Sequence, residues 1–166
     1  MASFHSKRFL KHDDYMTPKY AWENIQHLIP RDKIIWEAFF GDGKSGEYLK
    51  ELGFDVIHEP IDFFENDKGD IVVSNPPFSI SKEILKRLVE LDKPFILIMP
   101  SSKINTSYVR ELFKINDLQI IIPRKRIHFE KQIEGKKVEN WKNACNFDCF
   151  YYCWKMNLER DIIWLE

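Results

Sequence analysis

The sequence has little cysteine or glycine, no long apolar run and no excess of either charge. Its 25 Lys and Arg residues nearly balance its 26 Asp and Glu residues, which argues against a protein that binds nucleic acid over its whole surface. The longest apolar runs, at 95–99 and 118–123, are far shorter than the roughly 20 residues of a membrane span. The sequence does not show the pattern of a secretory signal peptide, in which a positively charged start precedes an apolar stretch and a cleavage site with small residues. We therefore expect a protein that is not secreted and lies in the cytoplasm, or in the nucleoid or nucleus if its substrate is there.

The three cysteines, Cys145, Cys149 and Cys153, follow each other at a spacing of four. On a strand this spacing puts all three on one face, where they cannot readily pair with each other. The sequence has no C-x-x-C pair for zinc, and the spacing differs from the one that radical enzymes use for an iron–sulfur cluster. We expect reduced, partly buried packing residues and no metal.

Length and composition indicate one domain spanning residues 1–166, with residues 1–13 flexible. The chain has 166 residues, 44% apolar and 31% charged, so it can bury one core and is not a disordered tail, a collagen-like fibre or a multidomain assembly. Apolar runs typical of strands alternate with helical patterns. This order predicts an α/β three-layer sandwich around a mainly parallel sheet, ending in an antiparallel pair of C-terminal strands without helices between them.

The expected elements place two turns at the same edge of the sheet. We expect helices at 19–27, 45–52 and 81–91 and strands at 33–39, 55–58, 70–74, 95–99, 118–122, 147–154 and 162–165. Thr17 and Pro18 are typical of a helix start, and Gly53 of the left-handed residue that closes a helix. Ligands bind at the carboxyl ends of such strands, where the strand order reverses. The glycine turn at 41–43 and the Asn-Pro-Pro-Phe turn at 75–78 lie there.

The segment from Ala38 to Ser45 allows three interpretations. As a phosphate-binding loop it would hold ATP, but Phe39 and Phe40 would crowd the phosphates, and no later strand ends in an acid for magnesium. As a plain tight turn it would bind nothing. As the approach to a helix N-terminus, its glycines would let the backbone contact a zwitterionic ligand.

Three acidic residues fit the last interpretation. Glu37, at the end of the preceding strand, would accept a hydrogen bond from an ammonium group. About twenty residues past the turn, Glu59 lies where an acid would hold a ribose diol, and Asp62 is close behind as an acceptor for an adenine amine. Which of Glu59 and Asp62 holds the ribose stays open.

The turn from Asn75 to Phe78 follows an apolar strand directly. Two prolines stiffen the exit from the strand, so the Asn75 side-chain oxygen and the Pro76 carbonyl could converge on one amine. Two acceptors hold both protons of an exocyclic amine and orient its lone pair toward an electrophilic methyl group. Phe78 would offer a surface on which an extruded base stacks. The alternative is a proline-stiffened loop with an aromatic core residue.

A basic segment follows in the last third of the chain. It contains seven Lys and Arg against three Glu between 124 and 142. Solvated loop charges would explain the cluster equally well. If the segment binds nucleic acid, the residues that would hold phosphates are Arg124, Lys125, Arg126, Lys136 and Lys137. His128 and Phe129 would then line the base pocket, and the equal alternative is that they are a packed pair.

In motif order the chain resembles the S-adenosylmethionine-dependent adenine-N6 methyltransferases, in a compact form like that of phages and large DNA viruses. The resemblance implies a Rossmann-like methyltransferase fold, reduced between the second strand and the catalytic strand. It implies that Tyr15, Thr17 and Pro18 contact the methionine end of the cofactor. It likewise implies that the residues that bind the cofactor include Glu37, Phe39, Gly41, Gly43, Glu59, Asp62 and Phe63. The catalytic residues that it implies are Asn75, Pro76, Pro77 and Phe78.

The chain departs from that family in its length. Only ten residues, 60–69, separate the second strand from the catalytic strand, and no insertion is long enough for a target-recognition domain. We therefore expect weak sequence preference, a partner subunit or a homodimer. The expected activity is methyl transfer to the N6 amine of adenine in DNA. The alternatives are RNA adenine, protein glutamine, and a non-catalytic nucleic-acid-binding subunit of the same fold.

Overall fold

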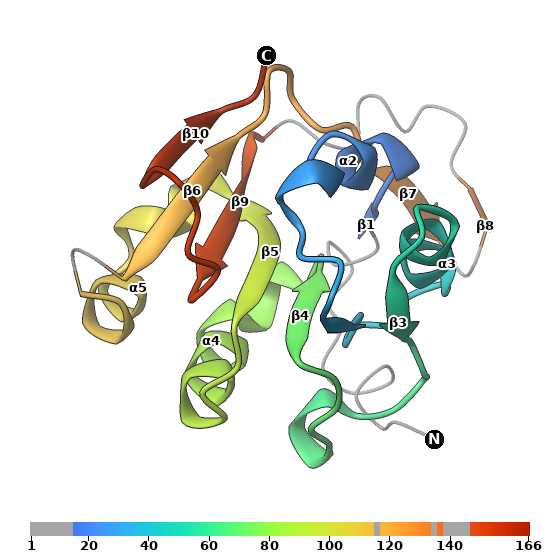
Figure 1. Ribbon diagram of the computed structural model, residues 1–166, viewed down its shortest axis with the longest axis horizontal. Coiled ribbons are helices and arrows are strands. Elements are labelled where there is room, and N and C mark those ends of the chain that lie inside the picture. The colour runs from blue at the N-terminus through green and yellow to red at the C-terminus, as the bar shows by residue number, and fades with distance from the viewer. Residues whose placement is uncertain (1–14, 115–116, 134–135, 138–146) are drawn as a thin grey trace.

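The computed structural model describes residues 15–114, 117–133, 136–137 and 147–166, with backbone only at 130–133 and 136–137. Figure 1 shows the arrangement of the elements along this part of the chain. In chain order they are β1 (Tyr15–Met16), α2 (Lys19–Glu23), η2 (Gln26–Leu28), β2 (Ile34–Trp36), α3 (Lys44–Glu51), β3 (Asp55–Ile57), η3 (Phe63–Glu65), β4 (Ile71–Ser74), η4 (Phe78–Ile80), α4 (Ser81–Glu90), β5 (Phe95–Pro100), η5 (Ser101–Asn105), α5 (Ser107–Leu112), β6 (Leu118–Ile122), β7 (Glu130–Ile133), β8 (Lys136–Lys137), β9 (Cys149–Trp154) and β10 (Ile162–Trp164).

A seven-stranded sheet has the order β10-β6-β9-β5-β4-β2-β3. β2 pairs in parallel with both β3 and β4, and β4 pairs in parallel with β5. β9 is antiparallel to its two neighbours, β5 and β6, and β10 is parallel to β6 at the outer edge. The strand order therefore reverses between β2 and β4, and the turns after both strands lie at one edge of the sheet.

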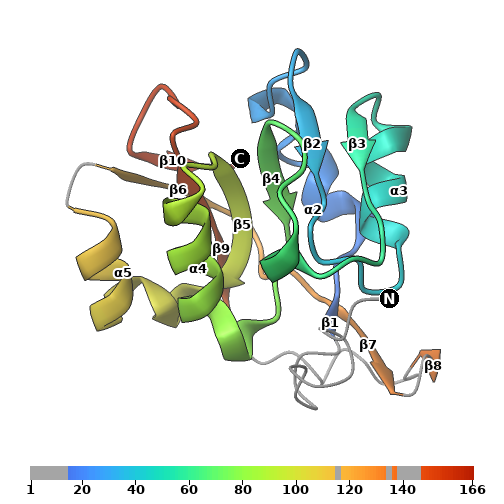
Figure 2. The same ribbon diagram turned by 90° about the horizontal axis from the view of Figure 1, so that it is seen from below.

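Helices cover both faces of this sheet, as Figure 2 shows with α4 and α5 on one side and α2 and α3 on the other. Successive residues of a strand point to opposite faces. On β4, Ile71 and Val73 pack in the core under α2 and α3, whereas Val72 packs in the core under α4 and α5. Because both faces are covered, β4 and β5 are buried along their whole length. The three-layer sandwich that the sequence predicts is confirmed.

A second sheet of three short strands has the order β1-β7-β8. The backbone of Tyr15 is opposite that of Lys131, and Met16 is opposite Glu130. This pairing joins the start of the described chain to a segment more than a hundred residues later. No sequence pattern indicates this sheet, because strands of two to four residues give no periodic signal.

Several expected helix boundaries need correction. The single helix expected at 19–27 is two pieces, α2 and η2, with Ile25 between them in a non-helical conformation. Pro18 is the residue before α2 rather than its first residue, and Thr17 does not cap it. The expectation that the late strands lack helices is wrong, since α5 lies between β5 and β6. Its six residues are too few for an amphipathic pattern to be read.

Other local expectations are confirmed. Gly53 follows α3 with φ +95° and closes the helix, since its N–H donates to the Lys50 carbonyl. The link between β3 and β4 contains only the short helix η3 and no strand, so the fold is reduced there. Cys149 and Cys153 are buried on the same face of β9, while Cys145 lies outside the described residues. Within the described ranges no helix has the length and apolar character needed to cross a membrane.

Candidate active site

The site lies where two parallel neighbours, β2 and β4, end. Trp36 is the last residue of β2 and is opposite Val72, two residues before the end of β4. Glu37 follows β2 directly and Asn75 follows β4 directly. Neighbouring parallel strands end at the same edge of a sheet, so the backbone brings these two polar side chains together although they are 38 residues apart.

Glu37 is 1% exposed and its carboxylate accepts three hydrogen bonds. The Phe39 amide donates to Oε1 at 3.1 Å, and the Ser74 hydroxyl, from the end of β4, donates to the same oxygen. The Ser45 hydroxyl, from α3, donates to Oε2 at 2.8 Å and itself accepts from Trp22 Nε1 at 2.8 Å. The Glu37 carboxylate therefore links the ends of β2 and β4 to α3 directly, and to α2 through Ser45.

Burial raises the pKa of Glu37 to about 7, although the three donors act in the opposite direction. Near neutral pH this carboxyl is poised between its neutral and charged forms. A cation that entered the site would favour the carboxylate and release the proton. The group is thus suited to an ammonium partner.

Asn75 has one of its two amide atoms satisfied. Its Nδ2 donates to the Tyr15 carbonyl of β1 at 3.2 Å. Its Oδ1 is buried, and among the described residues no donor reaches it. A buried acceptor without a donor costs free energy, about 1–3 kcal/mol in typical cases. Such an atom points to a ligand with N–H groups, because a ligand donor would remove that cost.

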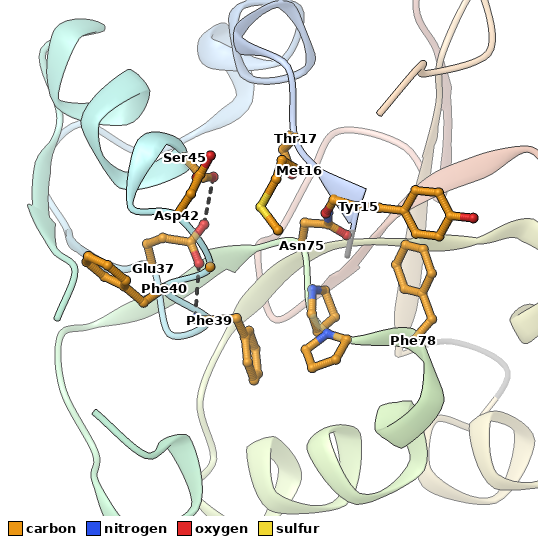
Figure 3. Close-up of a pocket in the computed structure, with 13 residues that line it drawn as sticks. Tyr15, Met16, Thr17, Glu37, Phe39, Phe40, Asp42, Ser45, Asn75 and Phe78 are labelled. Atoms are coloured by element: carbon orange, nitrogen blue, oxygen red, sulfur yellow. Dashed lines mark hydrogen bonds between the residues drawn. The ribbon is translucent and has the colours of Figure 1, made fainter. Parts of the chain in front are cut away.

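One pocket contains both groups, and Figure 3 shows the residues that line it. The pocket is open to solvent, and its cavity volume is about 40 Å³. Thirteen residues form the wall: Tyr15, Met16, Thr17, Glu37, Phe39, Phe40, Gly41, Asp42, Ser45, Asn75, Pro76, Pro77 and Phe78. The pocket therefore runs from β1, past the glycine turn, to the Asn-Pro-Pro-Phe turn.

The glycine turn depends on two left-handed residues. Gly41 has φ +58° and Gly43 has φ +81°, a region that residues with a Cβ rarely adopt. At Gly43 a Cβ would also lie 2.9 Å from Cζ of Phe40. Phe40 therefore folds back over the turn, where its ring stacks on His58 with centroids 5.8 Å apart.

The ATP interpretation of this turn does not fit the structure. In a phosphate-binding loop the backbone amides and the serine hydroxyl face the phosphates and magnesium. Here the Lys44 amide donates to Asp42 Oδ1 at 3.0 Å, and the Ser45 hydroxyl donates to Glu37. An acidic side chain thus occupies the position where a phosphate would bind.

The predicted residues separate into two groups. The pocket brings together all four residues of the predicted catalytic turn and the predicted cofactor residues Tyr15, Thr17, Glu37, Phe39 and Gly41. Sequence reasoning assigned no ligand role to Met16, Phe40, Asp42 and Ser45, which also line it. Met16, Phe40 and Asp42 each lie directly between two predicted residues, which was the signal for them, whereas Ser45 lies two residues after Gly43.

The remaining predicted cofactor residues lie outside the pocket wall. Pro18 precedes α2, and Gly43 is buried beneath Phe40. Glu59 is exposed just after β3. Asp62 accepts from the Phe64 amide at 2.9 Å. Phe63 is fully buried, with its ring centroid 4.9 Å from that of Phe39 and 5.5 Å from that of Trp36, so its ring is part of the core.

Phe78 is only 8% exposed, because other aromatic rings pack against it. Phe129 and Phe147 approach it edge-on, with centroids 6.2 and 5.7 Å away. Tyr15 contacts the same two rings. The open stacking face that the sequence predicts is therefore largely covered in this structure.

A second pocket adjoins the first on the far side of Phe78. Tyr15 and Phe78 line both pockets. The other wall residues of the second pocket are Ser79, Pro100, Ser102, Lys103 and Phe147. The Asn-Pro-Pro-Phe turn thus separates two hollows at the same edge of the sheet.

The predicted basic residues differ in their surroundings and hydrogen-bond partners. Arg124 and Lys125 are exposed just after β6. Arg126 binds Asp148 through Nε and Nη2 at 3.0 and 3.2 Å, which lowers the pKa of Asp148. His128 is exposed and its amide donates to the Tyr20 hydroxyl. The side chains of Lys136 and Lys137 lie outside the described residues.

Comparison with known proteins gives the family. Residues 23–159 match the family model described as the adenine-specific methyltransferase EcoRI. The chain belongs to this family. It is 34% identical over 117 residues to the type II methyltransferase M.EcoRI of Escherichia coli, a match that covers 70% of this chain and 30% of that protein. The matched region thus spans less than a third of this relative.

A solved structure from Listeria monocytogenes, described as a class I S-adenosylmethionine-dependent methyltransferase, has the same fold. The TM-score is 0.52, with 12% identity, and the superposition covers 96% of this chain and 68% of the other. At that identity the likeness concerns the fold alone. The predicted family and the predicted Rossmann-like methyltransferase fold are both confirmed.

Proposed function

We propose that this protein transfers a methyl group from S-adenosylmethionine to the exocyclic N6 amine of adenine in DNA. The observation that carries the proposal is the buried Oδ1 atom of Asn75, an acceptor without a donor in the described part of the chain, in the same pocket as the buried Glu37 carboxyl. Membership of an adenine-specific methyltransferase family supports the substrate. We further propose that residues 1–166 act as one domain.

The chemistry of the first pocket fits this cofactor. The carboxyl of Glu37, with its pKa of about 7, would accept the ammonium of the methionine part. Tyr15, Thr17 and the backbone at Gly41 would surround that part of the molecule. Beyond the pocket wall, Glu59, which is exposed, or Asp62, which is buried, would accept from the ribose. When bound, the cofactor supplies an electrophilic methyl group on a sulfonium.

The Asn-Pro-Pro-Phe turn would hold the acceptor amine. Asn75 Oδ1 accepts one amine hydrogen, and the Pro76 carbonyl accepts the other, so the nitrogen lone pair is directed away from both. The hydrogen bond from Asn75 Nδ2 to Tyr15 keeps Oδ1 turned to the ligand. The amine loses its proton after the new N–C bond forms, so no strong general base is required.

The second pocket would receive the rest of the base. It is bounded by the apolar rings of Phe78 and Phe147, which would contact the base, and by the polar side chains of Ser79, Ser102 and Lys103. Because adenine in a duplex is stacked, the base would be flipped out or already unpaired. The exposed Arg124 and Lys125 would contact phosphates, and Lys136 and Lys137 extend that prediction.

The test is a transfer assay with labelled S-adenosylmethionine on DNA, structured RNA and a glutamine-containing peptide in parallel. We expect label in DNA adenine, little in RNA and none in the peptide. The Asn75→Ala variant should lose transfer, whereas Asn105→Ala, at an exposed asparagine outside both pockets, should keep it. Label in RNA alone would replace DNA by RNA. Binding of DNA without binding of cofactor would instead identify a non-catalytic subunit.

Sequence recognition is a separate part of the proposal. The described elements form one sandwich and a small three-stranded sheet, and none of them forms a further recognition domain. We propose weak sequence preference, or recognition through a partner subunit or a second copy of the chain. Transfer to a set of DNA fragments of differing sequence measures this preference.

A further inference from the structure

A groove of about 570 Å³ lies away from the two pockets, between α2 and the ends of β6 and β10. Figure 1 shows β10 at the outer edge of the large sheet. The groove is lined by residues that the described active site does not use, together with two predicted basic residues: Tyr20, Asn24, His27, Pro123, Arg124, Lys125, Ile127, Ile163, Trp164, Leu165 and Glu166.

Two aromatic side chains of the groove are exposed. Trp164, the last residue of β10, is 71% exposed, more than any other large apolar side chain in the described residues. Tyr20 on α2 is 38% exposed. Exposed apolar side chains that gather in one place mark interaction sites, and Tyr and Trp are enriched at such sites.

Two cations of the groove are also available. Arg124 and Lys125 are exposed, and neither forms an ion pair with another described residue. Their neighbour Arg126 differs, since it is held by Asp148. Glu166 is the one acidic side chain in the groove lining. The side-chain charge therefore favours an anionic ligand.

The groove lies on the side of the sheet where the catalytic turn lies. β6 and β5 are both antiparallel to β9, so β6 runs in the same direction as β5. β10 is parallel to β6, and β4 is parallel to β5. The carboxyl ends of β4, β6 and β10 therefore lie at the same edge of the sheet. Arg124 and Phe129 are five residues apart, so their Cα atoms lie within about 18 Å of each other. Phe129 packs against Phe78 of the catalytic turn.

We propose that this groove binds an unpaired stretch of the nucleic-acid strand beside the acceptor base, with phosphates at Arg124 and Lys125 and a base stacked on Trp164. The inference rests on the proposed function for the identity of the ligand. Aromatic stacking combined with cations is the general pattern of proteins that hold single strands without reading sequence.

The test uses the full chain and a fluorescent single-stranded deoxyoligonucleotide that contains one adenine. The Trp164→Ala variant should bind it roughly 5- to 100-fold more weakly, the effect of removing one stacked base, whereas Trp164→Phe should retain most of the affinity. Ile162→Ala is the matched control, because Ile162 is 52% exposed on the same strand but does not line the groove. It should bind like the unaltered chain.

The salt dependence tests the two cations. Replacing both Arg124 and Lys125 by Gln should reduce the slope of log affinity against log salt by about 1.4, because each phosphate that is no longer neutralised accounts for about 0.7. Lys86→Gln removes an exposed charge from α4, on the other face of the sheet, and should leave the slope unchanged. An unchanged slope in the double variant would overturn the phosphate assignment.

Transfer kinetics separate this inference from the proposed function. With Trp164→Ala we expect a higher KM for the oligonucleotide and an unchanged kcat, because Trp164 does not touch the reacting atoms. Equal binding by Trp164→Ala, Ile162→Ala and the unaltered chain would overturn the groove assignment even if methyl transfer is intact. A dimer that Trp164→Ala dissociates, with unchanged oligonucleotide binding, would also overturn it. Trp164-dependent binding without transfer to any substrate would support the groove and contradict the proposed function.

Discussion

The two turns that form the site differ in how far their polar groups are satisfied. After β2, the Glu37 carboxylate accepts from Phe39, Ser45 and Ser74. After β4, the Asn75 oxygen accepts from no described residue. Both side chains occupy equivalent places at the ends of neighbouring parallel strands, so the strand geometry alone does not account for the difference.

The two sides of the site differ in whether their hydrogen bonds are already formed within the protein. The Glu37 side is assembled in advance: its donors hold the carboxyl in place while burial keeps its pKa near 7. The Asn75 side is incomplete: Nδ2 donates to the Tyr15 carbonyl, but no described residue donates to Oδ1. We interpret the first as the place of the methyl donor and the second as the place of the amine that accepts the methyl group.

The sharpest test of the contrast is Asn75→Ala. It removes the acceptor without disturbing the carboxyl network, so methyl transfer should fall by roughly 100-fold or more, because the amine is no longer oriented. Binding of S-adenosylmethionine, measured by calorimetry, should change little. A variant that loses cofactor binding as strongly as transfer would mean that the two sides of the site are not independent.

Glu37→Gln tests the other side. Losing a charge-assisted hydrogen bond to an ammonium should weaken cofactor binding by roughly 10- to 100-fold. In the unaltered chain the affinity should also fall as the pH drops below about 7, up to about tenfold for each pH unit, because the carboxyl must first lose its proton. Calorimetry at several pH values measures both effects. Glu47→Gln, an exposed change on α3, is the control and should show neither the lower affinity nor a lost pH dependence.

Glu37→Gln should also stabilise the protein above neutral pH. The folded-state pKa of Glu37 is raised from 4.5 to about 7, so its contribution to stability is present below about 4.5 and is lost as the pH rises through 7. At pH 8 Glu37→Gln should therefore increase the free energy of unfolding by on the order of 1–3 kcal/mol, and less at pH 5. Urea unfolding at both pH values tests this, and a variant that is less stable at pH 8 would contradict it.

Ser45→Ala should produce the smallest effect on cofactor binding. Ser45 donates to Glu37 and lowers its pKa, so its loss should move the midpoint of the pH dependence upward and weaken cofactor binding at pH 7 by a few-fold. Trp22 also loses its acceptor, at a cost of about 1–3 kcal/mol in stability. An unchanged pH midpoint would show that the hydroxyl does not influence the carboxyl.

The sequence predicted the fold where its signals are long and regular. The apolar patterns of β4, β5 and α4 predicted elements whose bounds in the structure differ from the expected ones by one residue at most. The short elements α5, β7 and β8 were missed, because so few residues carry no period. Pro18 was placed one residue too far into α2, since a proline fits either side of a helix start.

The site was predictable as a set of turns but not as a set of contacts. The order of the motifs predicted that Glu37 and Asn75 would meet, and the structure places both in one pocket. No sequence pattern indicated that Ser74 and Ser45 would share Glu37, or that Phe129 and Phe147 would cover Phe78. These contacts join segments far apart in the chain, and only the folded backbone brings them together. The roles of the predicted site residues stay predictions.

The most direct test of the central claim is to incubate the protein with S-adenosylmethionine and adenine-containing DNA, digest the DNA to nucleosides and identify the product by mass spectrometry. We expect the methyl group on N6 of adenine, and we expect Asn75→Ala to form none of this product while still binding the cofactor. Methylation of another base, or N6-methyladenine formed equally well by Asn75→Ala, would contradict it.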